Sequence, residues 1–246
     1  MLLRMTPAAK RRARQPHQLP PGRHGLPRAF VASNQRERIL DAVADVASLA
    51  GYASMSVEGI IATAGVSRRT FYDHFSDKQE AFLAAYDAIV ALLVERVQNA
   101  FLANTTFPGR VRDCLAAFLT FLASEPRFAD MCIVEVLAAG PEAVERRNGV
   151  MRAMTALIQA AAADLKEGQQ PPPLTAETIV GGIYEVVYSR VLQGKTEEMP
   201  EELQHDLTYS MMLPYIGHAA AKREAAKAPN VAMPEPDVAM SEPDDA

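Results

Sequence analysis

Arg68 and Arg69 stand side by side at the predicted start of a short helix, where their side chains could contact a ligand directly. An arginine in such a position can donate two parallel hydrogen bonds to O6 and N7 of a guanine in the DNA major groove. Thr70, the next residue, could contact a thymine methyl group or a phosphate. The three side chains therefore predict contacts with double-stranded DNA.

The residues around these three predict two short helices joined by a tight turn. Gly65 should end the first helix, because glycine enters the left-handed conformation at no steric cost. Ser56 and Ser67 should cap the two helices, since a serine hydroxyl accepts a hydrogen bond from an otherwise unpaired backbone N–H. Phe71 and Phe75 share one face of the second helix and can anchor it to a core. Two such helices form a helix-turn-helix, although the pattern alone also fits an ordinary helical hairpin.

At these residues the sequence resembles the TetR family of transcriptional repressors, over about 48 residues from about Arg36 to Leu83. The matching positions are Arg38–Val43, Gly51–Tyr52, Ser56–Val57, Ile60, Ala64–Ser67, Thr70–Tyr72, His74–Phe75 and Asp77–Glu80. Two positions depart from the family pattern, because Ile61 replaces the usual alanine and Gly59 lies inside the second helix. We expect these two residues to alter local packing without removing the motif.

The resemblance implies roles for further residues. Tyr72, His74 and Lys78 match family positions that usually contact the DNA backbone, and Ser56 matches a capping position that commonly meets phosphate. Lys78 also lies in the first turn of a predicted helix, where backbone N–H groups attract anions. The predicted DNA-binding residues are Ser56, Ser67, Arg68, Arg69, Thr70, Tyr72, His74 and Lys78.

The composition favours an all-α protein. The chain has 246 residues, of which 49% are hydrophobic, and alternating β-branched runs are scarce. Apolar residues at helical spacing predict about nine helices: an N-terminal head of three, a long helix over about 76–103, and a C-terminal helical body. The net charge of −5 hides an asymmetry, since residues 1–80 hold 12 Lys and Arg against 7 Asp and Glu. A basic N-terminal third could face phosphate.

The predicted domain boundaries are 1–33 for a disordered basic arm, 34–80 for the helix-turn-helix domain, 81–221 for an effector-binding and dimerisation domain, and 222–246 for a disordered acidic tail. The arm is rich in arginine and proline and should not form a packed unit. It could follow DNA phosphates or enter a minor groove, or it could be an inert extension.

The predicted body carries a carboxylate in an apolar run. Glu135 lies within Met131–Leu137, where a charge is costly unless it is paired or hydrated. Glu135 could meet a ligand, or it could pair with Arg127, Arg152 or Arg190. The residues predicted to bind a ligand are Leu93, Val97, Phe101, Phe118, Met131, Cys132, Glu135, Met151 and Met154, although methionines also commonly fill core gaps. An apolar pocket with one carboxylate predicts an apolar or cationic effector.

The last two long helices predict a homodimer. Resemblance to the family places the dimer seam there, and residues 175–220 carry more apolar surface than one core-facing stripe requires. The predicted interface residues are Val180, Ile183, Tyr184, Val187, Tyr188, Val191, Leu203, Leu207 and Met211. Tyr184 and Tyr188 could face either the ligand cavity or the seam. A symmetric dimer suits a near-palindromic site with half-sites about 34–36 Å apart.

The sequence patterns give no indication of catalysis, of a metal or cofactor site, or of a membrane span. The five histidines belong to no recognised nucleophile motif. Cys114 and Cys132 lie in apolar helical patterns without zinc-ligand spacing, which favours a cytoplasmic protein. The sequence therefore predicts a ligand-responsive DNA-binding repressor that is not an enzyme. The alternative is a helical ligand-binding or interaction protein that has lost DNA binding.

Overall fold

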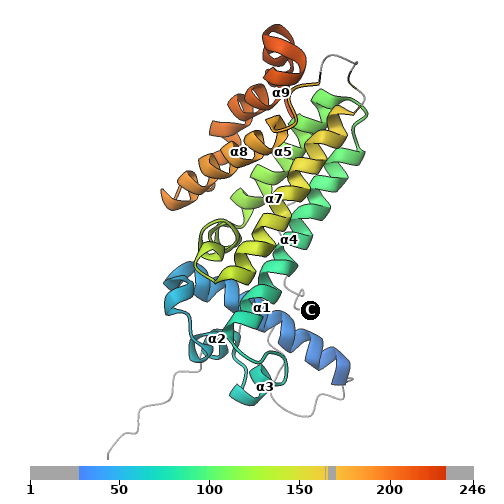
Figure 1. Ribbon diagram of the computed structural model, residues 1–246. Helices are drawn as coiled ribbons and strands as arrows, with labels where there is room; N and C mark the ends of the chain where they lie inside the picture. Colours follow the sequence, from blue (N-terminus) through green and yellow to red (C-terminus); the bar gives the residue numbers. More distant parts are fainter. Residues whose placement is uncertain (1–27, 164, 166–169, 231–246) are drawn as a thin grey trace, which may run out of the picture.

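The computed structural model describes residues 28–163, 165 and 170–230, and all regular secondary structure in these ranges is helical. This confirms the predicted all-α class. The α-helices are α1 (Arg28–Ser54), α2 (Val57–Ala64), α3 (Arg68–Tyr72), α4 (Lys78–Leu102), α5 (Phe107–Ser124), α6 (Pro126–Ala129), α7 (Pro141–Ala162), α8 (Thr175–Leu192) and α9 (Met199–Ala225). Figure 1 shows α1–α3 at one end of an elongated molecule and α9 at the other.

The two ends of the described chain differ from the predicted boundaries. α1 begins at Arg28 and not at Asn34, because no proline or glycine between Arg28 and Ala50 stops the helix. α9 continues to Ala225, beyond the predicted end, through a run of residues with high helix propensity. The rest of the predicted arm and most of the predicted tail lie outside the described residues.

The head comprises α1–α3 and the first turn of α4. Gly51 interrupts α1 with φ 75° and ψ 153°, a conformation that other residues rarely adopt. Gly65 ends α2 in the left-handed conformation, and its N–H donates to the carbonyl of Ile61, as the sequence predicted. The head core contains the buried side chains of Ile39, Val43, Ile60, Phe71, Phe75 and Phe82.

α4 joins the head to the body, which comprises α5–α9 and the turns between them. Its 25 residues span roughly 38 Å at 1.5 Å per residue. Asp77, not the predicted Ser76, is the N-cap and accepts a hydrogen bond from the Glu80 N–H at 2.8 Å. Ser76 instead donates its N–H and its hydroxyl to the Glu80 carboxylate, at 2.7 and 2.6 Å. Both residues therefore fix the direction in which α4 leaves the head.

The segment predicted as one helix over about 126–139 consists of three short pieces. α6 is followed by a π-helical turn, η1 (Asp130–Val134), and a 3-10 turn, η2 (Glu135–Leu137). The prediction of a single helix is wrong because long-range contacts decide this region: Asp130 and Glu135 both hydrogen-bond to α1. Such π turns often occur at functional sites.

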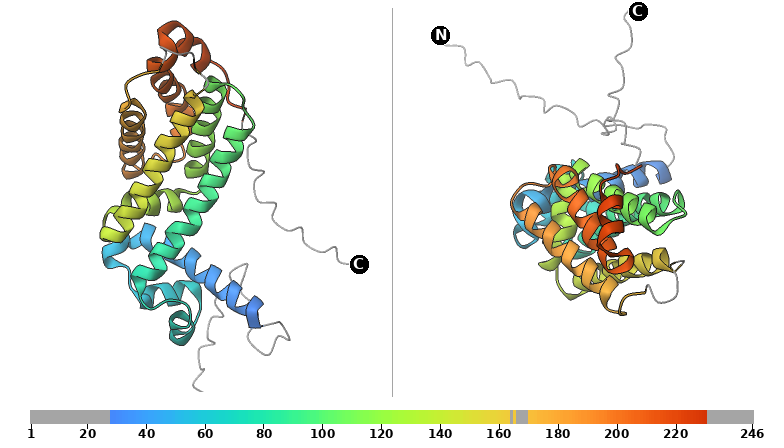
Figure 2. Two further views of the ribbon diagram at one scale, coloured as in Figure 1. Left: turned by 45° about the vertical axis from the view of Figure 1, so that its right-hand side comes forward. Right: turned by 90° about the horizontal axis from the view of Figure 1, so that it is seen from above.

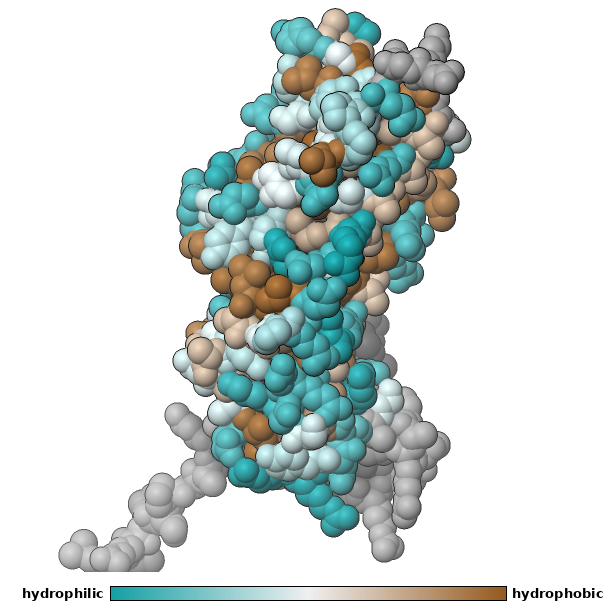
Figure 3. Space-filling model, viewed as in Figure 1, coloured by the Kyte–Doolittle hydropathy of each residue, from teal (hydrophilic) through white to brown (hydrophobic). Residues whose placement is uncertain are grey.

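The body is a bundle in which α5 packs against both α4 and α9, and α7 packs against α8. Figure 2 shows this bundle from the side and from above. The space-filling view in Figure 3 shows patches of hydrophobic surface on the body. None of the described helices is long and apolar enough to span a membrane, and no cluster of three metal-binding side chains occurs among the described residues.

Candidate DNA-binding surface and effector cavity

Two aromatic anchors and one serine fix α3 on the surface of the head. Phe71 is fully buried and Phe75 is 4% exposed, so one face of the helix is held in the core. Ser67 accepts a hydrogen bond from the Thr70 N–H at 3.0 Å, and the two hydroxyls are 2.8 Å apart. Arg38 of α1 donates to the carbonyls at the end of α2. The whole turn is thus rigidly placed.

The two arginines of α3 are exposed but differ in their contacts. Arg68 forms an ion pair with Glu58 of α2, with 2.7 Å between Nη1 and Oε1, and its guanidinium lies 5.7 Å from the centroid of the Tyr72 ring. The Arg69 side chain has no hydrogen bond or ion pair to the described part of the chain. The Arg69 side chain can therefore bind a base or phosphate directly, whereas the Arg68 side chain must first break its ion pair with Glu58.

Of the remaining predicted DNA-binding residues, Ser56, Tyr72 and His74 lie on or beside α3. The Ser56 hydroxyl accepts from the Gly59 N–H at 3.1 Å and caps α2, while Tyr72 is 46% exposed and His74 is half-buried beside Phe75. These side chains lie around α3, where DNA would bind.

Lys78 does not belong to this surface. Its Nζ donates to the carbonyl oxygens of Tyr52, at 3.1 Å, and Met55, at 2.8 Å. It also lies 4.7 Å from the centroid of the Tyr52 ring. The ammonium group therefore ties the end of α1 to the start of α4, and we propose this structural role for Lys78 in place of the predicted phosphate contact.

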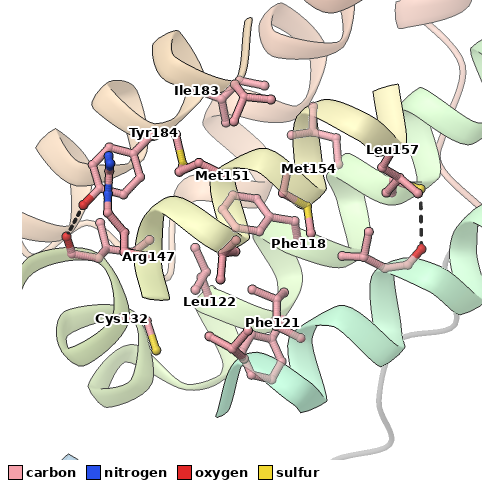
Figure 4. A pocket seen from close by; sticks show the side chains of 18 of the residues that line it. Phe118, Phe121, Leu122, Cys132, Arg147, Met151, Met154, Leu157, Ile183 and Tyr184 are labelled. Atoms are coloured by element: carbon pink, nitrogen blue, oxygen red, sulfur yellow. Dashed lines mark hydrogen bonds between the residues drawn. The ribbon is translucent and has the colours of Figure 1, made fainter. Parts of the chain in front are cut away.

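A cavity of about 130 Å³ lies in the body between α4, α5, η1, α7 and α8. Its walls are apolar apart from one end, where Arg147 of α7 lies beside Tyr184 of α8 (Figure 4). Burial raises the pKa of the Tyr184 hydroxyl and of the Tyr86 hydroxyl. Burial also raises the pKa of Cys114 and of Cys132 to about 12. All four groups are therefore neutral at pH 7, and Arg147 is the only charged residue among the described residues of the lining.

The cavity wall is bonded to the DNA-binding head. Cys132 and Ile133 line the cavity from η1, and the residues at the two ends of this segment reach α1. Asp130 accepts a hydrogen bond from the Ser48 hydroxyl at 2.8 Å. Glu135 accepts from the Tyr52 N–H at 2.5 Å, directly after the bend at Gly51.

A third contact to α1 lies close by. Arg127 of α6 donates to Asp45 at 2.8 Å. A displacement of the cavity wall at η1 would therefore act on α1 through several polar contacts.

Residues 39–85 match the family described as bacterial regulatory proteins, tetR family. The match begins in α1 and ends in α4, so it contains the entire helix-turn-helix. The helix-turn-helix head of this chain is that of the TetR family. The family consists of regulatory proteins, in agreement with the prediction that this chain is not an enzyme.

Individual relatives add detail to the family assignment. Over 118 residues the chain is 30% identical to the HTH-type transcriptional activator FasR of Mycolicibacterium smegmatis, a region that covers 48% of this chain and 54% of FasR. The chain thus spans about half the length of this curated relative.

Solved structures of two regulators named FadR share the fold. The fatty acid degradation regulator FadR from Bacillus halodurans superposes with a TM-score of 0.59 and 18% identity, over 74% of this chain and 95% of that one. FadR from Bacillus subtilis, in complex with stearoyl-CoA, superposes with a TM-score of 0.60 and 19% identity, over 74% and 98%.

Six of the nine predicted ligand-binding residues of this chain line the cavity. These six are Leu93, Val97, Phe118, Cys132, Met151 and Met154. Phe101 instead lies beneath the Arg110 guanidinium, 4.5 Å from it, and Met131 is fully buried outside the lining. Glu135 is turned towards α1, so no carboxylate is among the described residues that line the cavity. The cationic half of the predicted apolar or cationic effector thereby loses the carboxylate on which it rested.

Arg147 was missed by the sequence-based prediction. It lies four residues before Met151 and seven before Met154, so all three share one face of α7. That spacing could have identified Arg147. The residue stands, however, in a run of charged and polar side chains, Glu145–Asn148, which is typical of a solvent-exposed first part of a helix.

Most of the predicted interface residues are used within a single chain. Val187 is fully buried and Leu203 is 6% exposed, while Val180, Ile183, Tyr184 and Met211 line the cavity. Val191 is buried, and Tyr188 and Leu207 pack partly buried against the core. Val187, Val191, Val180, Leu203 and Met211 are thus covered within one chain, whereas the half-buried Ile183, Tyr184, Tyr188 and Leu207 keep part of their surface exposed. The interface therefore stays a prediction, since apolar spacing identifies a buried stripe but not the partner that covers it.

Several positions of α8 and α9 are exposed. A Cβ added at Gly181 or Gly182 would meet nothing within 4 Å. Leu192 is 58% exposed and Leu213 is 39% exposed. These positions remain available for contact with a second chain.

Proposed function

We propose that this chain is a homodimeric transcriptional repressor that binds near-palindromic DNA and is released from it by an elongated apolar ligand. One observation carries the proposal: α4 begins in the DNA-binding head and lines the body cavity with five residues. These are Tyr86, Ile89, Val90, Leu93 and Val97. A ligand in the cavity would therefore contact the same helix that positions the head.

The cavity supports a ligand with a long apolar part. It follows α4 from Tyr86 to Val97, a distance of roughly 16 Å at 1.5 Å per residue. The similarity to FadR of Bacillus subtilis, whose structure contains stearoyl-CoA, supports a fatty acyl compound. We propose a ligand of this class in place of the apolar or cationic effector expected from sequence.

The exposed face of α8 and α9 supports dimerisation. Gly181 and Gly182 would allow a second copy to approach closely, and Leu192 and Leu213 would add apolar contact. We place the DNA-binding domain at residues 28–80 and the dimerisation and effector domain after it. Such a dimer would hold two copies of α3 at a separation set by the body and would work in the cytoplasm, where the DNA lies.

The switch would pass through η1 as well as α4. A ligand must bind one arrangement of the heads better than the other, since equal affinity shifts nothing. A coupling of about 1–3 kcal/mol would change DNA affinity roughly 5- to 150-fold. The contacts from Asp130 and Glu135 to α1 supply a physical connection for that coupling.

The second candidate function is activation of transcription. It is favoured by the 30% identity to FasR, which is described as an activator. A promoter fused to a reporter, assayed with and without the gene for this chain, distinguishes the two, since loss of a repressor raises expression and loss of an activator lowers it.

The main test uses the purified full-length chain and a labelled DNA fragment from upstream of its own gene. We expect a salt-sensitive complex that resists competitor DNA, loses its specificity in an Arg68→Ala, Arg69→Ala double variant, and weakens when a fatty acid or acyl-CoA is added. If no competitor-resistant complex forms on this or any genomic fragment, the alternative of a helical ligand-binding protein without DNA binding replaces this proposal.

A further inference from the structure

We infer that Arg147 binds the head group of the cavity ligand and that this ligand is a free carboxylic acid with a long apolar chain. The inference rests on the proposed function, because it assumes that the cavity is the effector site. The ligand would be an anion, with its charged end at Arg147 and its apolar chain directed away from that residue.

Arg147 is a cation without a counter-ion. Within the described residues no carboxylate pairs with it, its Nη1 donates to the side-chain oxygen of Asn148 at 3.1 Å, and its neighbour Tyr184 is an uncharged hydroxyl. Its buried Nε has no hydrogen-bond partner. Arg147 is half-buried, and withdrawing part of a charged group from water is unfavourable unless the group is paired and hydrogen-bonded. An anion in the cavity would supply the missing partner.

The neighbouring arginines of α7 show that this lack of a partner is specific. Arg146 pairs with Asp87 and with Glu142, and Arg152 pairs with Glu145 at 2.8 Å. Both of these arginines lie outside the cavity lining. Of the three, only the arginine that faces the cavity lacks a carboxylate.

Tyr184 orients the guanidinium group. The guanidinium carbon lies 3.9 Å from the centroid of the Tyr184 ring, so one face of the group is covered by the aromatic ring. The Tyr184 hydroxyl donates to the Ile133 carbonyl at 2.6 Å, which fixes the ring in place. The edge of the guanidinium remains for hydrogen bonds, and its planar fork matches a carboxylate.

The rest of the cavity fits the hydrocarbon part of the ligand. Figure 4 shows Arg147, Tyr184 and Cys132 at one end, Phe118 and the methionines in the middle, and Leu157 at the opposite end. The carboxylate would therefore lie at the η1 end, and the chain would run along α4 towards Val97. A neutral ester or thioester would leave Arg147 without its charge partner.

The experiment measures binding of laurate, lauryl alcohol, methyl laurate and lauroyl-CoA to the full chain by isothermal titration calorimetry. We expect wild type to bind laurate more tightly than the alcohol and the methyl ester. Arg147→Met should weaken laurate binding roughly 10- to 100-fold, the range for a hydrogen bond to a charged group, and should leave binding of lauryl alcohol unchanged. Arg147→Lys should restore part of the laurate affinity.

Arg152→Met is the matched control, since it removes an arginine of the same helix from outside the cavity and should bind laurate as wild type does. The inference is overturned if laurate and lauryl alcohol bind wild type equally, or if folded Arg147→Met binds laurate normally. It is also overturned if lauroyl-CoA binds wild type and Arg147→Met equally well and more tightly than laurate, although the proposed function would then stand. If wild type binds none of the four compounds, the proposed fatty acyl effector fails as well.

Discussion

Arg68 can reach a DNA base only by leaving Glu58, to which it is paired at 2.7 Å. Both side chains are 62% exposed, so the pair contributes little to stability. The ion pair matters because Glu58 competes with DNA for the Arg68 guanidinium, and its carboxylate also repels phosphate.

Glu58→Gln should therefore strengthen DNA binding. Because an exposed ion pair is weak, its removal predicts only roughly two- to fivefold tighter binding, on the operator and on random DNA alike. Fluorescence anisotropy at fixed salt measures both affinities, and Glu177→Gln on the exposed side of α8 is the control. Unchanged or weaker binding in Glu58→Gln would show that Glu58 orients Arg68 for DNA instead of competing with it.

Lys78→Met should lower the stability of the protein more than its affinity for DNA. The variant loses two hydrogen bonds from a charged donor to the end of α1, which predicts a loss of about 1–3 kcal/mol in the free energy of unfolding. Urea denaturation measures this loss, and the exposed Lys195→Met serves as control. The reassignment of Lys78 is wrong if stability is unchanged while the salt dependence of DNA binding falls by about one charge.

At the residue scale, the sequence correctly predicted the helix caps, because a cap depends on hydrogen bonds to residues close by in the chain. Ser56, Ser67 and Gly65 act within four residues of their own positions, so the sequence was sufficient to identify them. The contacts of Lys78 with α1 could not be predicted from spacing, because its two acceptors lie 26 and 23 residues earlier in the chain.

At the scale of elements, η1 is a short segment with a cavity on one side and α1 on the other. Cys132 and Ile133 line the cavity, while Asp130 accepts a hydrogen bond from Ser48 and Glu135 accepts one from the Tyr52 N–H. A regular helix was predicted here, since apolar residues at helical spacing reveal nothing about contacts more than 80 residues away in the chain. The same reason explains why the carboxylate of Glu135 was placed in the ligand site.

Glu135→Ala should uncouple the ligand from DNA. The variant loses the hydrogen bond to the Tyr52 N–H, so movement of η1 would act less on the head. We expect near-normal affinity for each ligand alone, but a ratio of DNA affinities without and with effector that falls towards one. Anisotropy titrations at zero and saturating laurate measure that ratio.

Glu145→Ala, which removes an exposed carboxylate from α7, is the control for this experiment. An unchanged ratio in Glu135→Ala would mean that coupling runs through α4 without η1.

At the scale of the whole molecule, the exposed face of α8 should hold two chains together. Gly181→Arg adds a long charged side chain at a position where a Cβ meets nothing within 4 Å in the single chain. We expect a folded monomer that binds a half-site weakly and has lost the affinity of the dimer for the full operator. Sedimentation equilibrium gives the mass, and circular dichroism verifies the fold.

Ala156→Arg, on the exposed side of α7, should remain dimeric. A Gly181→Arg variant that sediments as wild type does would place the interface elsewhere. Val187→Glu, by contrast, should unfold the chain because its side chain is fully buried in the monomer.

The overall arrangement of helices was the feature of this protein that the sequence predicted best. An all-α chain with a helix-turn-helix head and a long connecting helix follows from periodicity and caps, and the structure has these parts. The surfaces between chains were least predictable, since the face of α8 that is apolar in sequence is covered by the cavity and the bundle core.

The two cysteines of this chain make the cavity measurable without any engineered label. Cys132 lies on the η1 wall and Cys114 contacts the Val97 carbonyl towards the other end, and the chain has no other thiol. Because each pKa is raised to about 12, alkylation by a small maleimide at pH 7 should be slow and should depend on entry of the reagent. Mass spectrometry of the two separate peptides would then report, during a single ligand titration, which part of the cavity fills first.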